Sequence, residues 1–149
     1  MRFGERFPNL FGEGDMTVWF HLACAAYKRP EPLLETLGTQ STELPDREGL
    51  ERRARSSLAF RRNVRIDGAE RSPTGQARCR HCHEAIARAS WRIRLAYHEQ
   101  GRFSPGGFLH LTCRTAYFEG HDVLEQLLCF THDLSDDDVE DLKRAYALG

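Results

Sequence analysis

The stretches Cys79-Arg80-His81-Cys82 and His110-Leu111-Thr112-Cys113 decide how this chain folds. The first is a C-x2-C pair, in which a tight turn points two thiolates at one position. The second is an H-x2-C pair, in which an imidazole and a thiolate project from the start of a helix, one turn apart. Together they form a Cys3His set, a closed four-ligand group with no position left for water. The sequence therefore predicts one structural zinc site and no catalytic metal.

Two histidines, His81 and His83, flank Cys82 and could compete as ligands, although the geometry of the C-x2-C pair favours the thiolates. The other alternative is that these Cys and His residues are core residues that share metal-ligand spacings by chance. The 27 residues between Cys82 and His110 leave room for a two- or three-stranded antiparallel sheet between the two halves of the site.

The remaining sequence limits the class of protein. The chain has 149 residues and five cysteines, and an odd cysteine number argues against a disulfide scaffold. Cys129 stands in an apolar context and is expected to be a small buried residue. Apolar stretches are short, and no apolar segment follows the N-terminus. We therefore expect no membrane association and an intracellular protein, in the cytoplasm or nucleoid of a bacterium or the nucleus of a eukaryote.

A second H-x2-C pair, His21 and Cys24, reveals an internal repeat. It matches His110 and Cys113 at an offset of 89, and Arg2 matches Arg92 at an offset of 90. The counterparts of Cys79 and Cys82 would precede Met1. The first copy is therefore expected to be N-terminally truncated, with His21 and Cys24 as possible orphan metal ligands. A misassigned start, a fragment, or a unit that has lost its metal would each explain this.

The expected fold class is a small α+β zinc-binding domain, repeated, with short antiparallel sheets plus helices. Residues 1–58 form a partial unit without its C-x2-C pair, 59–68 a linker, and 69–149 a complete unit. Glycine and proline predict irregular structure over 63–75 and a loop over 101–107, whereas period-2 alternation predicts a strand over 91–97. The other predicted elements are strands at 2–3 and 18–20 and helices at 21–29, 31–37, 44–62, after Cys113, and from an N-cap at Ser135 to about 147. Trp19 and Trp91 are expected to pack in the cores.

Charge is unevenly distributed, although the formal net charge is only −1. Residues 47–94 hold 13 arginines against five carboxylates, a net charge of +8, whereas residues 119–149 hold nine carboxylates against two basic side chains, a net charge of −7. Such a chain either has two solvated faces of opposite sign or has an anion-binding centre with an acidic end held away from it.

Three stretches together resemble the poly(ADP-ribose) polymerase-type zinc finger: residues 75–86, 90–93 and 107–113. The shared features are the C-x2-C pair, the long gap, the H-x2-C pair, an arginine ten residues after the second cysteine (Arg92), and a leucine followed by an acidic helix over 134–142. The resemblance covers residues 69–146, and residues 1–58 resemble a finger that lacks its first ligand pair.

The resemblance implies zinc-dependent recognition of DNA strand breaks or ends, through contacts with the phosphate backbone and stacking of one side chain on an exposed base pair. Carried over by position, Arg92 would contact phosphate and Phe103 would stack on the exposed base pair. The other DNA-binding residues would be Arg78 and Arg80, as neighbours of Arg92, and Arg102, the cation of the loop that holds Phe103. No polymerase or other catalytic segment is recognisable, so we expect no enzymatic activity.

Two other functions compete with this one. A protein-interaction module would use zinc only for stability and dock a partner on its acidic tail or arginine-rich helix. A thiol enzyme using Cys113 with His110 is disfavoured, because both residues are better explained as ligands and no orienting carboxylate is evident. Salt dependence separates the first two functions, since binding through phosphates weakens steeply as salt rises.

Overall fold

The computed structural model describes all residues from Met1 to Gly149 and divides into two compact units. Unit 1 comprises Met1–Val64 together with His98–Ser104, and unit 2 comprises Arg65–Tyr97 and Pro105–Gly149. Each unit contains an antiparallel sheet and helices, so the predicted α+β class with short sheets is confirmed. No helix combines the length and apolarity needed to cross a membrane.

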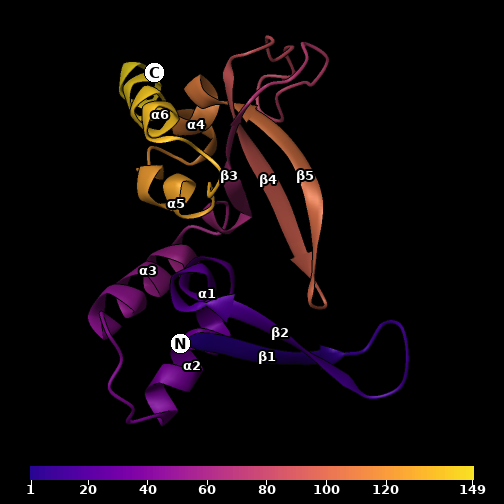
Figure 1. Cartoon of the computed structure of the whole chain (residues 1–149), viewed down its shortest axis with the longest axis vertical. Helices are drawn as coiled ribbons and strands as arrows, with labels where there is room; N and C mark the ends of the chain where they lie inside the picture. Colours follow the sequence, from indigo (N-terminus) through magenta and orange to yellow (C-terminus); the bar gives the residue numbers. More distant parts are fainter. The chain divides into compact units, whose positions relative to one another are not determined.

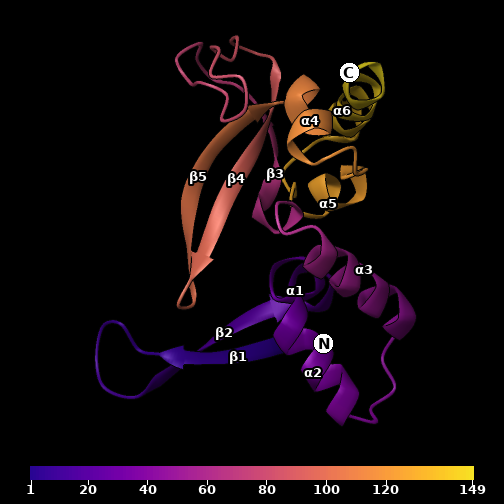
Figure 2. The same cartoon turned by 180° about the vertical axis from the view of Figure 1, so that it is seen from behind.

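Unit 1 consists of a two-stranded hairpin followed by three helices (Figures 1 and 2). The elements are β1 (Arg2–Pro8), β2 (Asp15–His21), α1 (Leu22–Lys28), α2 (Pro30–Thr39) and α3 (Arg47–Ala59). One face of the hairpin is buried, because Phe3 pairs with Phe20 and both join the core. The helices complete this core with Ala25, Ala26, Leu33, Leu37, Leu50 and Ala54.

Unit 2 is a three-stranded sheet with helices on one side of it, as both views show (Figures 1 and 2). The strand order is β3-β4-β5, and β3 pairs antiparallel with β4. Its elements, with the 3-10 turn η1 (Asn63–Arg65) that leads into them, are β3 (Ile66–Arg71), β4 (Trp91–Glu99), β5 (Arg102–His110), η2 (Leu111–Cys113), α4 (Arg114–Tyr117), α5 (Leu124–Cys129) and α6 (Asp136–Leu148).

The structure corrects two of the predicted irregular segments. Strand β3 occupies residues that glycine and proline content assigned to a linker, because Ile66 and Ala69 are buried in the unit 2 core. The predicted loop over 101–107 is also wrong, since β5 begins at Arg102. The turn is confined to Gln100 and Gly101, which both have positive φ, 47° and 80°. Two such residues form the tight type I′ connection that suits the twist of a hairpin.

The predicted closing helix is confirmed as α6. The Oγ of Ser135 accepts a hydrogen bond from the backbone N–H of Asp138 at 3.2 Å, which makes Ser135 the N-cap. Asp136, Asp137 and Asp138 occupy the first turn, where the positive end of the helix dipole favours carboxylates. Much of the acidic character of the C-terminal segment therefore serves the helix itself.

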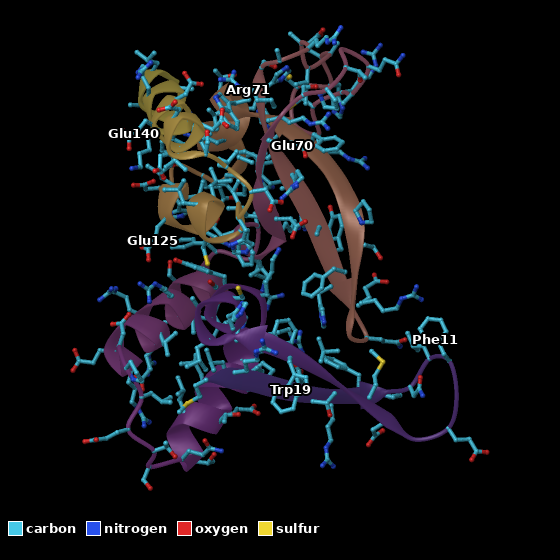
Figure 3. The ribbon with its side chains drawn as sticks, viewed as in Figure 1. Phe11, Trp19, Glu70, Arg71, Glu125 and Glu140 are labelled. Carbon is cyan, nitrogen blue, oxygen red and sulfur yellow. The ribbon has the colours of Figure 1, made fainter.

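The two tryptophans behave differently from each other. Trp91 is only 6% exposed, and its Nε1 donates a hydrogen bond to Asp141 Oδ2 at 2.8 Å, so its predicted packing role is confirmed. Trp19 is 62% exposed on the outer side of the β1–β2 hairpin, so the same prediction is wrong for it (Figure 3). Cys129, expected to be buried, is half-buried at the end of α5.

Candidate metal centre

Four side chains from two separate segments of unit 2 converge on one point: Cys79, Cys82, His110 and Cys113. Cys79 and Cys82 lie in the irregular segment between β3 and β4, His110 ends β5, and Cys113 ends η2. The two segments are joined by backbone contacts, because Arg80 N–H donates to Phe108 O at 2.8 Å and Cys79 bridges to Phe108. This bridge brings the C-x2-C pair to the end of β5.

The distances fit a small divalent metal ion. One ligand atom from each residue lies within 4.8 Å of all the others. The Nδ1 of His110 is 3.3 Å from Cys82 Sγ and 3.8 Å from Cys113 Sγ. A tetrahedral zinc ion with Zn–S bonds of about 2.3 Å places its ligand atoms about 3.5–3.8 Å apart. The two distances from His110 are close to this range, so the predicted four-ligand group is assembled around a space that could hold one metal ion.

The imidazole of His110 is held in the orientation that a ligand needs. Its Nε2 lies 3.1 Å from the carbonyl oxygen of Ala85, while Nδ1 faces the sulfur atoms. A carbonyl oxygen can only accept a hydrogen bond, so Nε2 carries the proton and donates it. The lone pair of Nδ1 is then free for a metal, and the Ala85 carbonyl fixes the ring as outer-sphere partners of metal ligands do.

The sulfur atoms of the group differ in their tendency to ionise. Burial raises the pKa of Cys79, but backbone N–H groups, including those of Cys82, His110 and His81, outweigh it and lower that pKa to about 6. Burial, with the neighbouring sulfurs of Cys82 and Cys79, raises the pKa of Cys113 to about 12. Several thiolates crowded together repel each other unless a cation neutralises them, and metal binding drives their deprotonation. The donor set therefore fits a metal that prefers sulfur and nitrogen.

The other proposed ligands do not join this group. His81 and His83 are exposed and lie outside it, although they flank Cys82. In unit 1, His21 is exposed and Cys24 is half-buried, and neither belongs to a cluster of three or more potential ligands.

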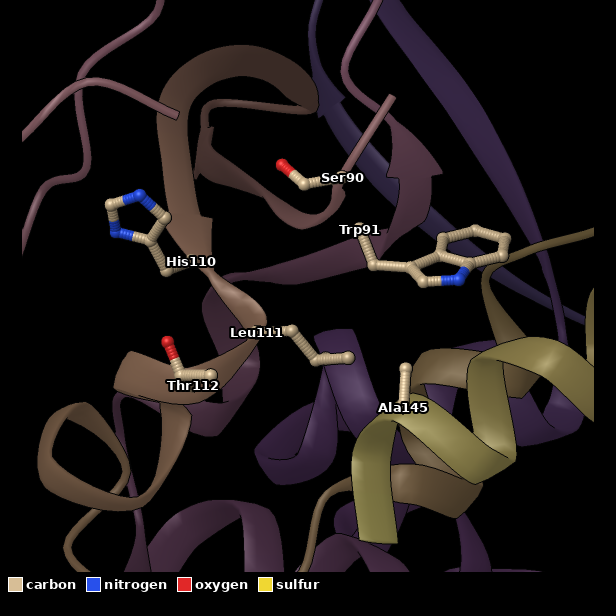
Figure 4. A pocket seen from close by; sticks show the side chains of 6 residues that line it. All are labelled: Ser90, Trp91, His110, Leu111, Thr112 and Ala145. Carbon is tan, nitrogen blue, oxygen red and sulfur yellow. The ribbon is translucent and has the colours of Figure 1, made fainter. Parts of the chain in front are cut away.

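A small open pocket of about 210 Å³ adjoins the four-ligand group (Figure 4). His110 lines it as well as belonging to the ligand set, and the other lining residues are Ser90, Trp91, Leu111, Thr112 and Ala145. The lining is mostly apolar and holds no carboxylate.

Arg92, expected to contact phosphate, is buried in unit 2 and only 6% exposed. Its Nη2 and Nε donate to Glu70 Oε1 at 2.5 and 2.9 Å, and its guanidinium carbon lies 3.6 Å from the centre of the Phe108 ring. Nη1 donates to Ser72 Oγ at 3.3 Å. The donors of Arg92 are thus directed at partners within the protein.

The other predicted DNA contacts are more accessible. Arg78 and Arg80 are exposed, and each donates one hydrogen bond to a backbone carbonyl, at His83 and Gly106 respectively. Arg102 is exposed in unit 1. Phe103 is 42% exposed, because its ring packs against His98 at 4.7 Å and Phe20 at 6.1 Å between centroids.

The most exposed aromatic ring of the chain, Phe11, is not among the predicted site residues and is 80% exposed in the loop between β1 and β2 (Figure 3). The guanidinium carbon of Arg102 lies 5.3 Å from the centre of this ring. A usable signal was present in the sequence, since Phe11 stands between turn-forming residues where no core contact is expected.

No protein-family model matches the chain, and no curated protein matches its sequence, so the comparisons assign no family.

Proposed function

We propose that this chain is a non-enzymatic DNA-binding module of the poly(ADP-ribose) polymerase zinc-finger type, stabilised by one zinc ion and directed at DNA strand breaks or ends. The observation that carries the proposal is the closed Cys3His donor set, built from the two motifs that the family resemblance rests on. Zinc held by Cys79, Cys82, His110 and Cys113 would link the irregular segment to the end of β5 and would supply stability, not chemistry.

The order of elements supports the proposed repeat. Unit 1 runs β1-β2-α1-α2-α3, and the last part of unit 2 runs β4-β5-α4-α5-α6. Arg2 begins β1 as Arg92 lies at the start of β4, and His21 ends β2 as His110 ends β5. We propose that unit 1 is a second copy of this arrangement.

The base-stacking role that the resemblance assigns to Phe103 is better suited to Phe11. A stacking side chain needs a free aromatic face, and Phe11 is 80% exposed whereas Phe103 packs against two rings. The connection between β1 and β2 is six residues long, residues 9–14, and it carries Phe11. Arg102 beside the ring supplies a cation for a neighbouring phosphate.

The basic side chains proposed to contact phosphates are Arg78, Arg80 and Arg102, which are exposed. Backbone contacts of this kind position a protein without reading the base sequence, so we expect binding with little sequence preference. Arg92 is proposed as a structural residue of this module.

Fluorescence anisotropy tests the proposal with the zinc-loaded chain, a nicked duplex and the same duplex intact, each at two salt concentrations. We expect tighter binding to the nicked duplex, weaker binding at higher salt, and loss of binding when a chelator removes zinc. Phe11→Ala should weaken binding to nicked DNA about tenfold or more and should affect intact duplex less. Leu58→Ala, a change of an exposed apolar residue on α3, is the matched control and should bind as wild type does.

Equal affinity for nicked and intact duplex would exclude break recognition. Absence of binding to either DNA would favour the alternative, a zinc-stabilised module for protein partners.

A further inference from the structure

The outer face of the β1–β2 hairpin carries an aromatic ring that no core contact explains. Directly opposite residues of an antiparallel pair project to the same face. The register pairs Arg2 with His21, Gly4 with Trp19, and Arg6 with Thr17, and all six of these residues are exposed. The opposite face, with Phe3 and Phe20, is the one that the core covers.

The indole of Trp19 lies flat across its cross-strand neighbour. A Cβ atom built on Gly4 would lie 2.7 Å from Cζ3 of Trp19 and 3.0 Å from Cε3 and Cη2, so the six-membered ring sits directly over the glycine. Glycine at this position lets the ring approach the backbone. One side of the ring is therefore supported by β1, and its 62% exposure belongs to the other side.

Two unpaired cations flank this ring. Arg2 and Arg6 are exposed, stand on the same face two residues to either side of Gly4, and make no ion pair or side-chain hydrogen bond in the structure. The one charged side chain of the inner face, Glu5, is instead paired with Arg29, which follows α1. Four residues of extended strand separate Arg2 from Arg6 by about 13 Å. The one carboxylate on the outer face, Asp15, lies at its far end, opposite Pro8.

We infer that this outer face binds an unpaired base of single-stranded DNA by stacking it on Trp19, with Arg2 and Arg6 contacting the phosphates on either side. A supported aromatic face between cations is the combination by which proteins hold single strands without reading sequence. The inference deepens the proposed function and rests on it for the ligand class, because a strand break with a gap or an overhang presents unpaired bases. It uses a different surface from Phe11.

Tryptophan fluorescence tests the inference directly. The chain has two tryptophans, and Trp91 is buried, so a Trp91→Phe background leaves Trp19 as the only reporter. The probe is an oligothymidylate, and its control is an abasic oligonucleotide of equal length, which carries the phosphates without bases. We expect oligothymidylate to quench Trp19 fluorescence and the abasic strand to bind more weakly without comparable quenching.

Substitutions in the full-length chain locate the contact. Trp19→Ala should weaken binding of oligothymidylate about tenfold or more, measured by anisotropy, and Trp19→Phe should restore part of the affinity. Gly4→Ala should also weaken it, because the new Cβ displaces the ring while the indole remains. Arg2→Ala and Arg6→Ala should each weaken binding and reduce its salt dependence. Thr17→Ala, on the same face, is the matched control and should change little.

Circular dichroism of each variant separates lost binding from lost folding. The inference is overturned if oligothymidylate leaves Trp19 fluorescence unchanged, or if folded Trp19→Ala binds it with wild-type affinity. A preference for nicked duplex that depends on Phe11, together with wild-type affinity of folded Trp19→Ala for oligothymidylate, would overturn the Trp19 surface and leave the proposed function standing. Quenching of Trp19 fluorescence by oligothymidylate, without any preference for nicked over intact duplex, would support base stacking on Trp19 and exclude break recognition.

Discussion

The guanidinium of Arg92 lies between a carboxylate and an aromatic ring inside unit 2. It donates two hydrogen bonds to Glu70 and lies over the ring of Phe108. Alternation along β4 would by itself place Arg92 at the surface. The structure instead buries its charged side chain together with its partner, Glu70. Burial of a charge is tolerated only when a partner of opposite charge and hydrogen bonds compensate it.

Arg92→Ala should therefore destabilise the protein by about 2–4 kcal/mol, because it leaves the Glu70 carboxylate without its closest partner and removes a cation–π contact. Urea unfolding followed by circular dichroism measures this. Arg144→Ala is the matched control, since Arg144 is exposed and its nitrogen is 3.9 Å from Asp141, and its effect should stay within about 0.5 kcal/mol. Wild-type stability combined with reduced DNA affinity would instead make Arg92 a phosphate ligand.

The half-buried imidazole of His98 predicts a pH dependence of unit 1. Burial, and then the positive charge of Arg29, lower its pKa, because both disfavour the imidazolium. Its Nδ1 is 3.3 Å from Arg29 Nη1, and its Nε2 has no hydrogen-bond partner. The unfolded chain, with a histidine pKa of about 6.5, takes up the proton first as pH falls. Stability from this residue is complete above that pKa and declines as pH falls towards the lower folded pKa.

His98→Phe keeps a ring at this position and removes the titration. We expect the difference in free energy of unfolding between wild type and this variant to become less favourable to wild type from pH 7 to pH 5, measured by urea unfolding at both values. The two proteins share the same metal ligands, so the difference isolates His98. Free energies of unfolding that change equally with pH in both proteins would contradict this role of His98.

At the scale of elements, the two hairpins differ in their connections. The β1–β2 connection of six residues exposes Phe11, whereas the β4–β5 turn of two residues leaves Phe103 within a strand and a ring cluster. The glycine and proline of residues 101–107 indicated a loop, yet pairing with β4 made most of that stretch a strand. A strand forms where its neighbour offers hydrogen bonds, and local composition does not report that neighbour.

Gly101→Ala should destabilise the β4–β5 turn by about 1–2 kcal/mol. Gly101 has a φ of 80°, and a Cβ there would lie 2.9 Å from the ring of Phe7, so the alanine meets both backbone strain and a clash. Gly38→Ala is the contrasting control, because Gly38 lies in α2 with open space around its position. Alanine there should raise stability by about 0.5–1 kcal/mol. Thermal unfolding of both variants measures the two opposite shifts, and a neutral Gly101→Ala would contradict the turn geometry.

At the scale of the whole molecule, each unit has its own core, but only unit 2 has a cluster of side chains that could hold a metal ion. A unit of about 80 residues buries a small core and gains little net stability from it. In units of this size, a structural metal contributes much of the free energy of unfolding. Zinc binding at such sites contributes on the order of 10 kcal/mol.

Removing the metal should therefore unfold unit 2. In a Trp19→Phe background, Trp91 reports on this unit alone, and a strong chelator at neutral pH should shift its emission to longer wavelength as the residue becomes exposed. Cys113→Ser should have the same effect without chelator, whereas Cys129→Ser, outside the ligand group, should keep one metal ion per chain and the wild-type emission. Elemental analysis of the same samples measures the metal. A metal-free chain with Trp91 still buried would show that zinc is not structural.

The ligand group, the N-cap at Ser135 and the α+β class follow from the sequence, because each depends on residues close together in the chain or on a repeated spacing. The burial of Arg92, the packing of Phe103 and the exposure of Trp19 and Phe11 depend on which elements pack together. Alternation along a strand divides its side chains between two faces, but the face that becomes covered is set by helices and strands distant in the sequence. Tertiary packing alone therefore decided which arginines and which aromatic rings face solvent.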